Sequence, residues 1–361
     1  MASRVIIDDF LIQQRAALLV DGKPQRFAIS GMTRGPVAGA RFMAKLGKLS
    51  GQDWMAQTDQ GFEVHISARR AKQLRGLSEG RKIPIEITRA AGGDKAPEAK
   101  VVNPDTPLRP NWDEIDAFLA ALPEHFDGPI HIGTPALWNA RAATWKSAFA
   151  HLAPHFEQHF GAPGEMFETA DCEDVLAHLS QHRWPIGNKQ RLDFASVHGI
   201  TVIDVNAGAQ NNRLSTNIAA AQALPHLITL AQLGGLMVVD FIDLERRADK
   251  QAVLAALDDA LASSAIEARR TGWSQFGLVE LQMKRAGPSL PEALHRDNHA
   301  ALKGPQLVCS AYKTAIAGQP KPLSIAAEPA VAKWLIQQGS EAVLSDRLHM
   351  PITITQRDPL S

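Results

Sequence analysis

The sequence predicts a mixed α/β (α+β) fold in which a small β-barrel near the N-terminus precedes a larger α/β domain and a small C-terminal αβ subdomain. Three observations carry this prediction. Residues 32–102 contain four or five short strand-like runs, residues 199–244 alternate strand, helix and strand, and a proline-rich stretch at 103–111 separates the two regions. The length of 361 residues is enough for two or three domains.

The overall composition limits the classes of function. Lysine and arginine together number 38, as do aspartate and glutamate, so any nucleic-acid contact has to come from a local basic patch. Cys172 and Cys309 are too few for a disulfide framework or a four-cysteine zinc site, and they fit a reducing cytosol. The sequence shows neither the apolar stretch of a secretory signal nor a span long enough to cross a membrane, which predicts a soluble, cytoplasmic protein.

The N-terminal hundred residues are rich in strand signals. Residues 3–29 alternate apolar and polar side chains around Asp21 and Gly22, which predicts a hairpin at the edge of a sheet. The runs that follow predict a closed barrel of the oligonucleotide-binding type.

Barrels of this type bind nucleic acid through exposed aromatic side chains and a basic groove. The segment offers aromatic candidates at Phe42, Trp54 and Phe62. It also offers a basic cluster, formed by Arg69, Arg70, Lys72 and Arg75. Two interpretations of the cluster stay open, an RNA contact and an ordinary solvated surface.

Residues 136–160 predict a long helix broken at Pro154. His151, His155 and His159 would lie on one face of it because they are four residues apart. Such a stripe could bind zinc, but no acidic ligand or general base accompanies it, so a polar surface stripe is the favoured interpretation.

The segment 199–244 predicts a βαβ unit with a strand at 199–205, an alanine-rich helix at about 216–233 and a second strand at 236–241. Both strands are β-branched runs, which is typical of strands buried on both faces. A right-handed crossover brings the strand ends, and with them Asp204 and Asp240, to the same edge of the sheet. Two carboxylates with water suit Mg²⁺ or Mn²⁺ in phosphoryl transfer, whereas the alternative is that each aspartate caps the element that follows.

The remaining chain predicts a long amphipathic helix at 245–271, a strand at 276–281 and a helix, strand, helix, strand order over 306–361. The loop after the first βαβ strand lacks a G-x-G-x-x-G pattern, which argues against dinucleotide binding.

Four segments, IDVN, TNIAAA, LGGLMVVDFIDL and FGLVELQMKRAGPSL, together resemble the catalytic core of the ribonuclease E/G family in order and spacing. The resemblance implies a magnesium-dependent endoribonuclease that cleaves single-stranded RNA and leaves a 5′-phosphate. Asp204 and Asp240 would hold Mg²⁺, with Mn²⁺ as a substitute, and Asn206 would complete the catalytic set.

The resemblance also implies five parts of the chain. They are N-terminal strands that pack with the 105–180 region (1–36), an S1-like RNA-binding barrel (37–103), a reduced ribonuclease-H-like subdomain (104–180), a catalytic metal-binding domain (181–295) and a C-terminal αβ subdomain (296–361).

Residues expected to bind RNA are basic, amide or aromatic and lie around the catalytic unit and in the barrel. They are Lys284, Arg285, Asn212, Arg213, Trp54, Phe62, Arg69 and Arg70.

The chain departs from the family pattern in several places. No pair of cysteines follows residues 288–290, so no zinc is expected and a homodimer would not form through a zinc link. The region between barrel and catalytic unit is too short for the family's 5′-end sensor, and His198 replaces a family glutamate. The alternatives are therefore a non-catalytic or weakly catalytic RNA-binding protein of the same family and a phosphohydrolase that acts on mononucleotides.

Overall fold

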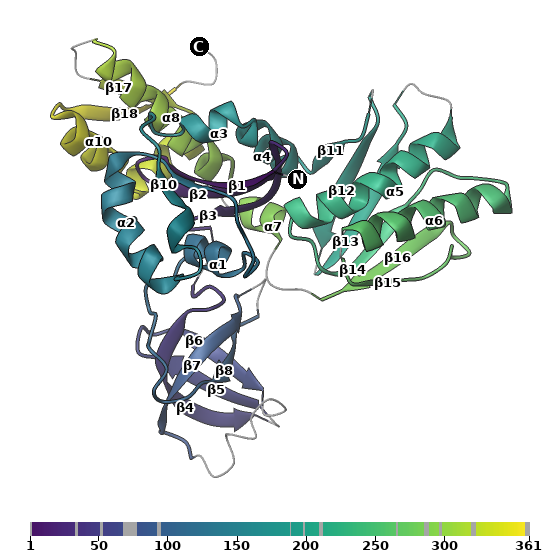
Figure 1. Cartoon of the computed structure of the whole chain (residues 1–361), viewed down its shortest axis with the longest axis horizontal. Coiled ribbons are helices and arrows are strands. Elements are labelled where there is room, and N and C mark those ends of the chain that lie inside the picture. Colours follow the sequence, from purple (N-terminus) through teal and green to yellow (C-terminus); the bar gives the residue numbers. More distant parts are fainter. Residues whose placement is uncertain are drawn as a thin grey trace. The chain divides into compact units, whose positions relative to one another are not determined.

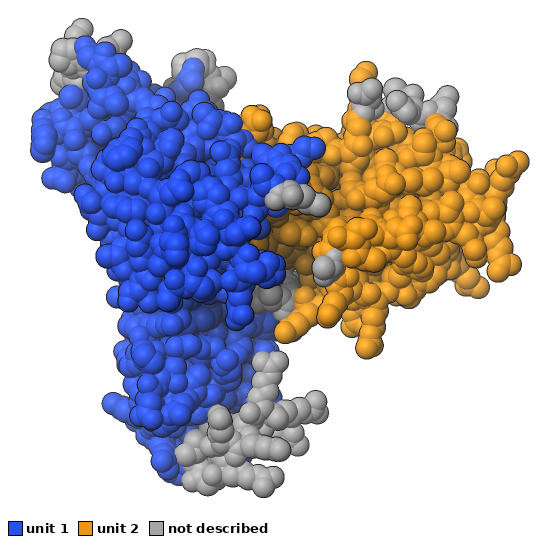
Figure 2. All heavy atoms as spheres, in the orientation of Figure 1, with its two compact units in different colours: residues 1–23, 27–170, 299–361 blue, residues 24–26, 171–298 orange. Residues whose placement is uncertain are grey.

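The structure is a computed structural model of the chain. It describes residues 2–32, 35–50, 53–67, 78–91, 95–187, 189–197, 199–208, 212–264, 266–284, 289–295, 298–318 and 323–357. The chain forms two compact units (Figure 2). Unit 1 comprises residues 1–23, 27–170 and 299–361, and unit 2 comprises residues 24–26 and 171–298.

The elements alternate between strand-rich and helix-rich regions along the chain (Figure 1). The strands are β1 (Ser3–Asp9), β2 (Gln14–Val20), β3 (Lys23–Ile29), β4 (Arg41–Ser50), β5 (Asp53–Thr58), β6 (Glu63–Ser67), β7 (Lys82–Arg89), β8 (Glu98–Val101), β9 (Ile130–Ile132), β10 (Phe156–Gln158), β11 (Arg183–Pro185), β12 (Arg191–Val197), β13 (Ile200–Asn206), β14 (Gly235–Asp240), β15 (Ala268–Arg270), β16 (Leu278–Met283), β17 (Leu323–Ala327) and β18 (Ile352–Gln356). The helices are α1 (Glu114–Ala120), α2 (Pro135–Ala148), the 3₁₀ turn η3 (Ala153–His155), α3 (Glu165–Thr169), α4 (Cys172–Ser180), α5 (Arg213–Leu230), α6 (Arg247–Ser263), α7 (Leu290–His295), α8 (Asn298–Ile316), α9 (Pro329–Gln337) and α10 (Ser340–Leu348).

The first sheet has the strand order β10-β9-β1-β2-β3. β1 pairs antiparallel with β2 and parallel with β9, so it is a central strand. The predicted hairpin around Asp21 and Gly22 joins β2 to β3, and β3 is the last strand in this order, so the prediction of an edge hairpin is confirmed. Val5, Ile6 and Ile7 of β1 are at most 2% exposed because β1 has neighbours on both sides.

The predicted barrel is confirmed. Strands β4-β5-β6-β8-β7 close into a five-stranded barrel around a core of small and branched apolar side chains. Phe42 lies inside this core and is 2% exposed, so its predicted role as an exposed aromatic is wrong. Trp54 packs against the core from a half-buried position, and the half-buried ring of Phe62 lies 6.2 Å from that of Phe42.

The second sheet, in unit 2, has the order β11-β12-β13-β14-β16-β15. β13 and β14 run parallel and are joined through α5, which confirms the predicted βαβ unit. Helices α5 and α6 lie over one face of this sheet (Figure 1).

The other face of the second sheet is open. Along β13 and β14 every second residue is buried and the alternate ones are largely exposed. Ile200 and Val202 are 41% and 46% exposed. The prediction that both faces are buried is therefore wrong, because residue type alone does not distinguish an exposed valine from a buried one.

Two predicted helices end earlier than expected, and one helix was not predicted. The helix predicted over 136–160 is α2, which ends at Ala148, and η3 and the strand β10 follow it. His151, His155 and His159 consequently do not share a helix face. The helix predicted over 245–271 ends at Ser263, and a further helix, α10, precedes the last strand. Within the described ranges, no helix is long and apolar enough to cross a membrane.

A buried carboxylate at the end of β1 gives unit 1 a pH-dependent stability. Burial raises the pKa of Asp8 from 3.8 to about 6, although the backbone N–H groups of Phe167, Asp9 and Gly164 donate to its carboxylate. The folded chain therefore binds this proton more tightly than the unfolded chain, and protonation stabilises the fold. The stabilisation is complete at low pH and is lost as pH rises from about 4 through about 6.

We expect the free energy of unfolding of the wild type to fall by about 2 kcal/mol relative to Asp8→Asn between about pH 4.5 and about pH 7.5. Urea titrations at both pH values measure this difference, and the comparison cancels the hydrogen-bond loss in the variant. Equal pH dependence in the two proteins would show that Asp8 does not titrate in this window.

Candidate active site

Two aspartates lie side by side on the open face of the second sheet. The parallel register pairs Asp204 of β13 with Asp240 of β14. Both side chains are exposed, whereas Ile203, Val205 and Val239 beside them point into the core under the helices. Since neighbouring strands are about 4.8 Å apart, the two carboxylates share one small region of the surface.

A third aspartate extends this row. Asp193 of β12 lies opposite Asp204 in the antiparallel pairing. Its carboxylate is already neutralised, with Arg191 Nε at 2.9 Å and Arg183 Nε at 3.4 Å. Asp193 was not predicted as a site residue, because its only signal in the sequence is a polar position between the apolar Leu192 and Phe194, which the structure buries.

Asn206 joins two members of the row. Its Nδ2 atom donates to Asp193 Oδ2 at 2.7 Å and to Asp204 Oδ2 at 2.8 Å. Both neighbours are acceptors, which fixes the orientation of the amide and leaves its Oδ1 atom available to accept. Asn206 is therefore held in place by Asp193, whose charge Arg191 and Arg183 neutralise.

The carboxylate of Asp240 is repelled by those of Asp204 and Asp243. Partial burial and the negative charges of Asp204 and Asp243 raise the pKa of Asp240. Continued strand alternation from Asp240 would point Asp243 to the opposite face, but β14 ends at Asp240 and the alternation ends with it. A cation bound between these carboxylates would relieve the repulsion.

A buried asparagine positions the chain after β14. Asn217, with 0% exposure in α5, donates from Nδ2 to Ile242 O at 2.7 Å, and Ile242 N donates to Asn217 Oδ1 at 3.0 Å. This two-way hydrogen bond fixes Ile242, which lies between Asp240 and Asp243. Asn217 belongs to the TNIAAA segment and was not predicted as a site residue.

The other predicted site residues are spread over the molecule. Asn212 caps α5 by accepting from Ser215 N at 3.0 Å, and Arg213 is exposed in the first turn of that helix. Lys284 is exposed directly after β16. Arg285, Arg69, Arg70 and His198 lie outside the described residues.

The donor set at the row is small. Within the described ranges, no three His, Cys, Asp or Glu side chains are arranged to enclose a metal ion.

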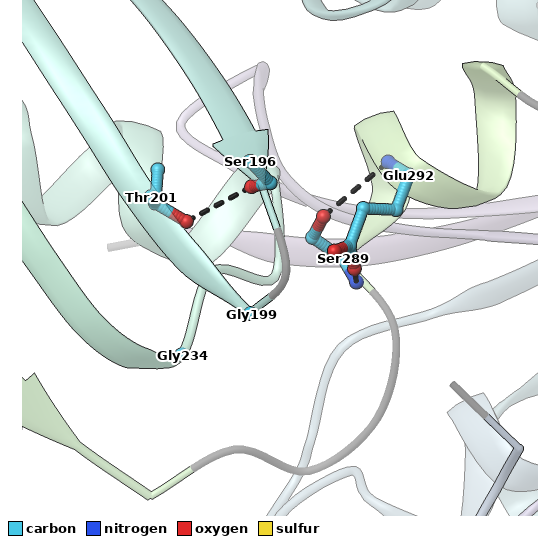
Figure 3. Close-up of a pocket in the computed structure, with 6 residues that line it drawn as sticks. All are labelled: Ser196, Gly199, Thr201, Gly234, Ser289 and Glu292. Atoms are coloured by element: carbon cyan, nitrogen blue, oxygen red, sulfur yellow. Dashed lines mark hydrogen bonds between the residues drawn. The ribbon is translucent and has the colours of Figure 1, made fainter. Parts of the chain in front are cut away.

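A small crevice lies at the end of β13 and β14 that is opposite to the aspartates. Figure 3 shows it between Gly199, Gly234 and Ser289, with hydrogen bonds joining Ser196 to Thr201 and Ser289 to Glu292. Its volume open to water is about 0 Å³. Because it admits no ligand, the aspartate row is the better candidate for chemistry.

Part of this chain is similar to known ribonucleases. Ribonuclease G of Haemophilus influenzae is 27% identical over 198 residues, which cover 50% of this chain and 40% of that protein. Ribonuclease G of Escherichia coli K12 is 27% identical over 144 residues, covering 38% and 29% of the two chains. A ribonuclease E/G-like protein of Porphyra purpurea is 32% identical over 111 residues, covering 29% and 22%. The matched part spans less than half the length of each of these relatives.

The family model described as Ribonuclease E/G family matches residues 125–286, which include the whole aspartate row and Asn217. The resemblance to the ribonuclease E/G family that the sequence predicted is thereby confirmed over residues 125–286.

Proposed function

We propose that the protein is a magnesium-dependent endoribonuclease that cleaves single-stranded RNA and leaves a 5′-phosphate. The observation that carries the proposal is the pairing of Asp204 with Asp240, beside an oriented Asn206; among the described residues neither aspartate forms an ion pair. These residues lie within the segment that matches the family, and the relatives it matches are named ribonucleases.

The chemistry of the row fits a hard divalent cation. Asp193 already forms ion pairs with Arg183 and Arg191, so Asp204 and Asp240 would be the protein ligands of the ion. Mn²⁺ could substitute for Mg²⁺ at such a site. When bound, the ion would polarise the scissile phosphate and lower the pKa of the attacking water.

Asn206 would orient the reacting groups. Both of its N–H bonds are held by carboxylates, so its free Oδ1 atom can accept a hydrogen bond from the attacking water. Asp193 acts through Asn206 and is a positioning residue.

RNA would be held by groups outside the row. The exposed Lys284 and Arg213 can neutralise phosphates, and the barrel offers Trp54 and Phe62 for contact with bases. Because the formal net charge of the chain is zero, we expect this binding to depend on these local groups.

The test is cleavage of an internally labelled single-stranded RNA with Mg²⁺, Mn²⁺ or EDTA. We expect cleavage with either ion, none with EDTA, and products whose 5′ ends can be ligated without prior phosphorylation. Cleavage that persists in EDTA would contradict the metal dependence. Salt-dependent RNA binding without any cleavage would instead identify a binding protein, and hydrolysis of mononucleotides but not RNA would identify a phosphohydrolase.

A further inference from the structure

A cavity of about 520 Å³ opens beside the aspartate row in unit 2. It is lined by Pro185, Gly187, Lys189, Gln190, Arg191 and Gly208. The strand register places Arg191 opposite Asn206, and Gly208 follows β13 two residues after Asn206. The cavity is therefore at the end of the sheet where the candidate catalytic residues converge.

We infer that this cavity is a subsite for one nucleotide of single-stranded RNA, next to the phosphodiester that is cleaved, with Lys189 binding its phosphate. The inference rests on the proposed function and adds a substrate-binding residue to it.

The charges around the cavity single out Lys189. Its side chain is exposed, and within the described ranges it forms no ion pair. Arg191, the other cation in the lining, already donates from Nε to Asp193. Lys189 is therefore the cation that an incoming phosphate can use without breaking an existing ion pair.

The size of the cavity suits a small ligand. Its volume of about 520 Å³ lies within the range of roughly 300–1,000 Å³ that is usual for small-molecule sites. A single nucleotide fits such a space, whereas a duplex does not. The ring of Pro185 provides an apolar surface beside the charged groups.

The backbone beneath Lys189 is fixed in two ways. Gly208 has a φ of +60°, and a Cβ atom there would lie 2.4 Å from Lys189 O, so the two loops meet at a point that admits no side chain. Gln190, 9% exposed, donates from Nε2 to Thr216 Oγ1 at 2.8 Å and so ties the loop to α5. A lysine on a fixed base loses less conformational freedom on binding, which favours a specific phosphate site.

The first experiment measures binding alone. A fluorescein-labelled single-stranded RNA of about twelve nucleotides is titrated in EDTA with wild type, Lys189→Ala, Lys189→Arg and the control Lys333→Ala, which removes an exposed lysine from α9. We expect Lys189→Ala to bind about 10-fold more weakly and to lower the slope of log affinity against log salt by about 0.7. Lys189→Arg and Lys333→Ala should keep the wild-type slope, and circular dichroism shows that each variant is folded.

The second experiment locates the contact along the RNA. Single phosphates around the cleavage site are replaced one at a time by neutral methylphosphonates, and KM is measured with Mg²⁺. We expect one substitution, adjacent to the cleaved bond, to raise KM of the wild type about 10-fold and to leave KM of Lys189→Ala unchanged.

The two experiments separate failure of the subsite from failure of the proposed function. If the wild type cleaves RNA but Lys189→Ala behaves like Lys333→Ala, the subsite is wrong and the ribonuclease proposal stands. If no RNA is cleaved, the salt slope in EDTA still decides whether Lys189 binds a phosphate, and an unchanged slope overturns the inference.

Discussion

Asp204→Asn and Asp240→Asn are each expected to reduce RNA cleavage at least about 1,000-fold while the protein stays folded, because metal binding contributes several kcal/mol to the transition state. Each substitution keeps the size of the side chain but removes a full negative charge from a row in which, among the described residues, Asp193 pairs with arginine and Asp204 and Asp240 do not. Single-turnover cleavage at saturating protein measures the chemical step without the influence of product release.

Asp240→Asn should lower cleavage but stabilise the folded protein slightly. The charges of Asp204 and Asp243 raise the pKa of Asp240, so Asp240→Asn removes a repulsion. Both side chains are exposed, and we expect neither substitution to lower the free energy of unfolding by more than about 0.5 kcal/mol.

A matched control is Asp259→Asn, which neutralises an exposed aspartate on α6 and should retain wild-type cleavage. Calorimetric titration with Mn²⁺ gives an independent readout, because both site variants should lose the binding that Asp259→Asn keeps. Wild-type cleavage by either site variant would remove Asp204 and Asp240 from the mechanism.

The position of these aspartates could be predicted from the chain because it depends on local patterns. Two β-branched runs joined by a helix are expected to form a parallel pair, and the right-handed crossover brings their ends to one edge. The register of the structure, with Asp204 opposite Asp240, follows from this arrangement.

The open face of the same sheet could not be predicted. Val202 and Val238 lie on that face, while Ile203 and Val239 lie on the buried one, so both faces are apolar in sequence. The alternation of polar and apolar residues that normally distinguishes a solvent-exposed face from a buried one is therefore absent at these positions. Only the covering by α5 and α6 distinguishes the faces, and it is a tertiary property (Figure 1).

Asp193 and Asn217 were missed for a related reason. The importance of Asp193 arises from pairing between β12 and β13, and that register is not visible in the sequence of either strand. Asn217 resembles an ordinary polar residue of a helix, yet it lies on the buried face with Ala220, Ala221 and Leu224. A polar residue at an apolar position of a helix was the available signal.

Asn217→Ala is expected to lower the free energy of unfolding by about 3 kcal/mol and to reduce cleavage by the remaining folded protein about 10-fold or more. The substitution removes both hydrogen bonds to Ile242 and leaves a partly buried N–H and C=O without the side chain that paired with them. The stability loss follows from that desolvation. The activity loss follows because Ile242 connects Asp240 to Asp243, and a looser connection no longer fixes the carboxylate of Asp240.

Two further variants make this expectation specific. Gln222→Ala removes an exposed amide from the same helix and should change the free energy of unfolding by no more than about 0.5 kcal/mol. Asn217→Asp keeps the acceptor for Ile242 N but places a carboxylate oxygen against Ile242 O, so it should destabilise the protein at least as much as alanine does. Urea unfolding measures the stabilities, and cleavage is measured well below the unfolding transition so that every variant is folded. If Asn217→Ala matched Gln222→Ala in both assays, the chain after β14 would hold Asp240 in place without Asn217, and the rigidity of the site would have to come from the strand pairing with β13 alone.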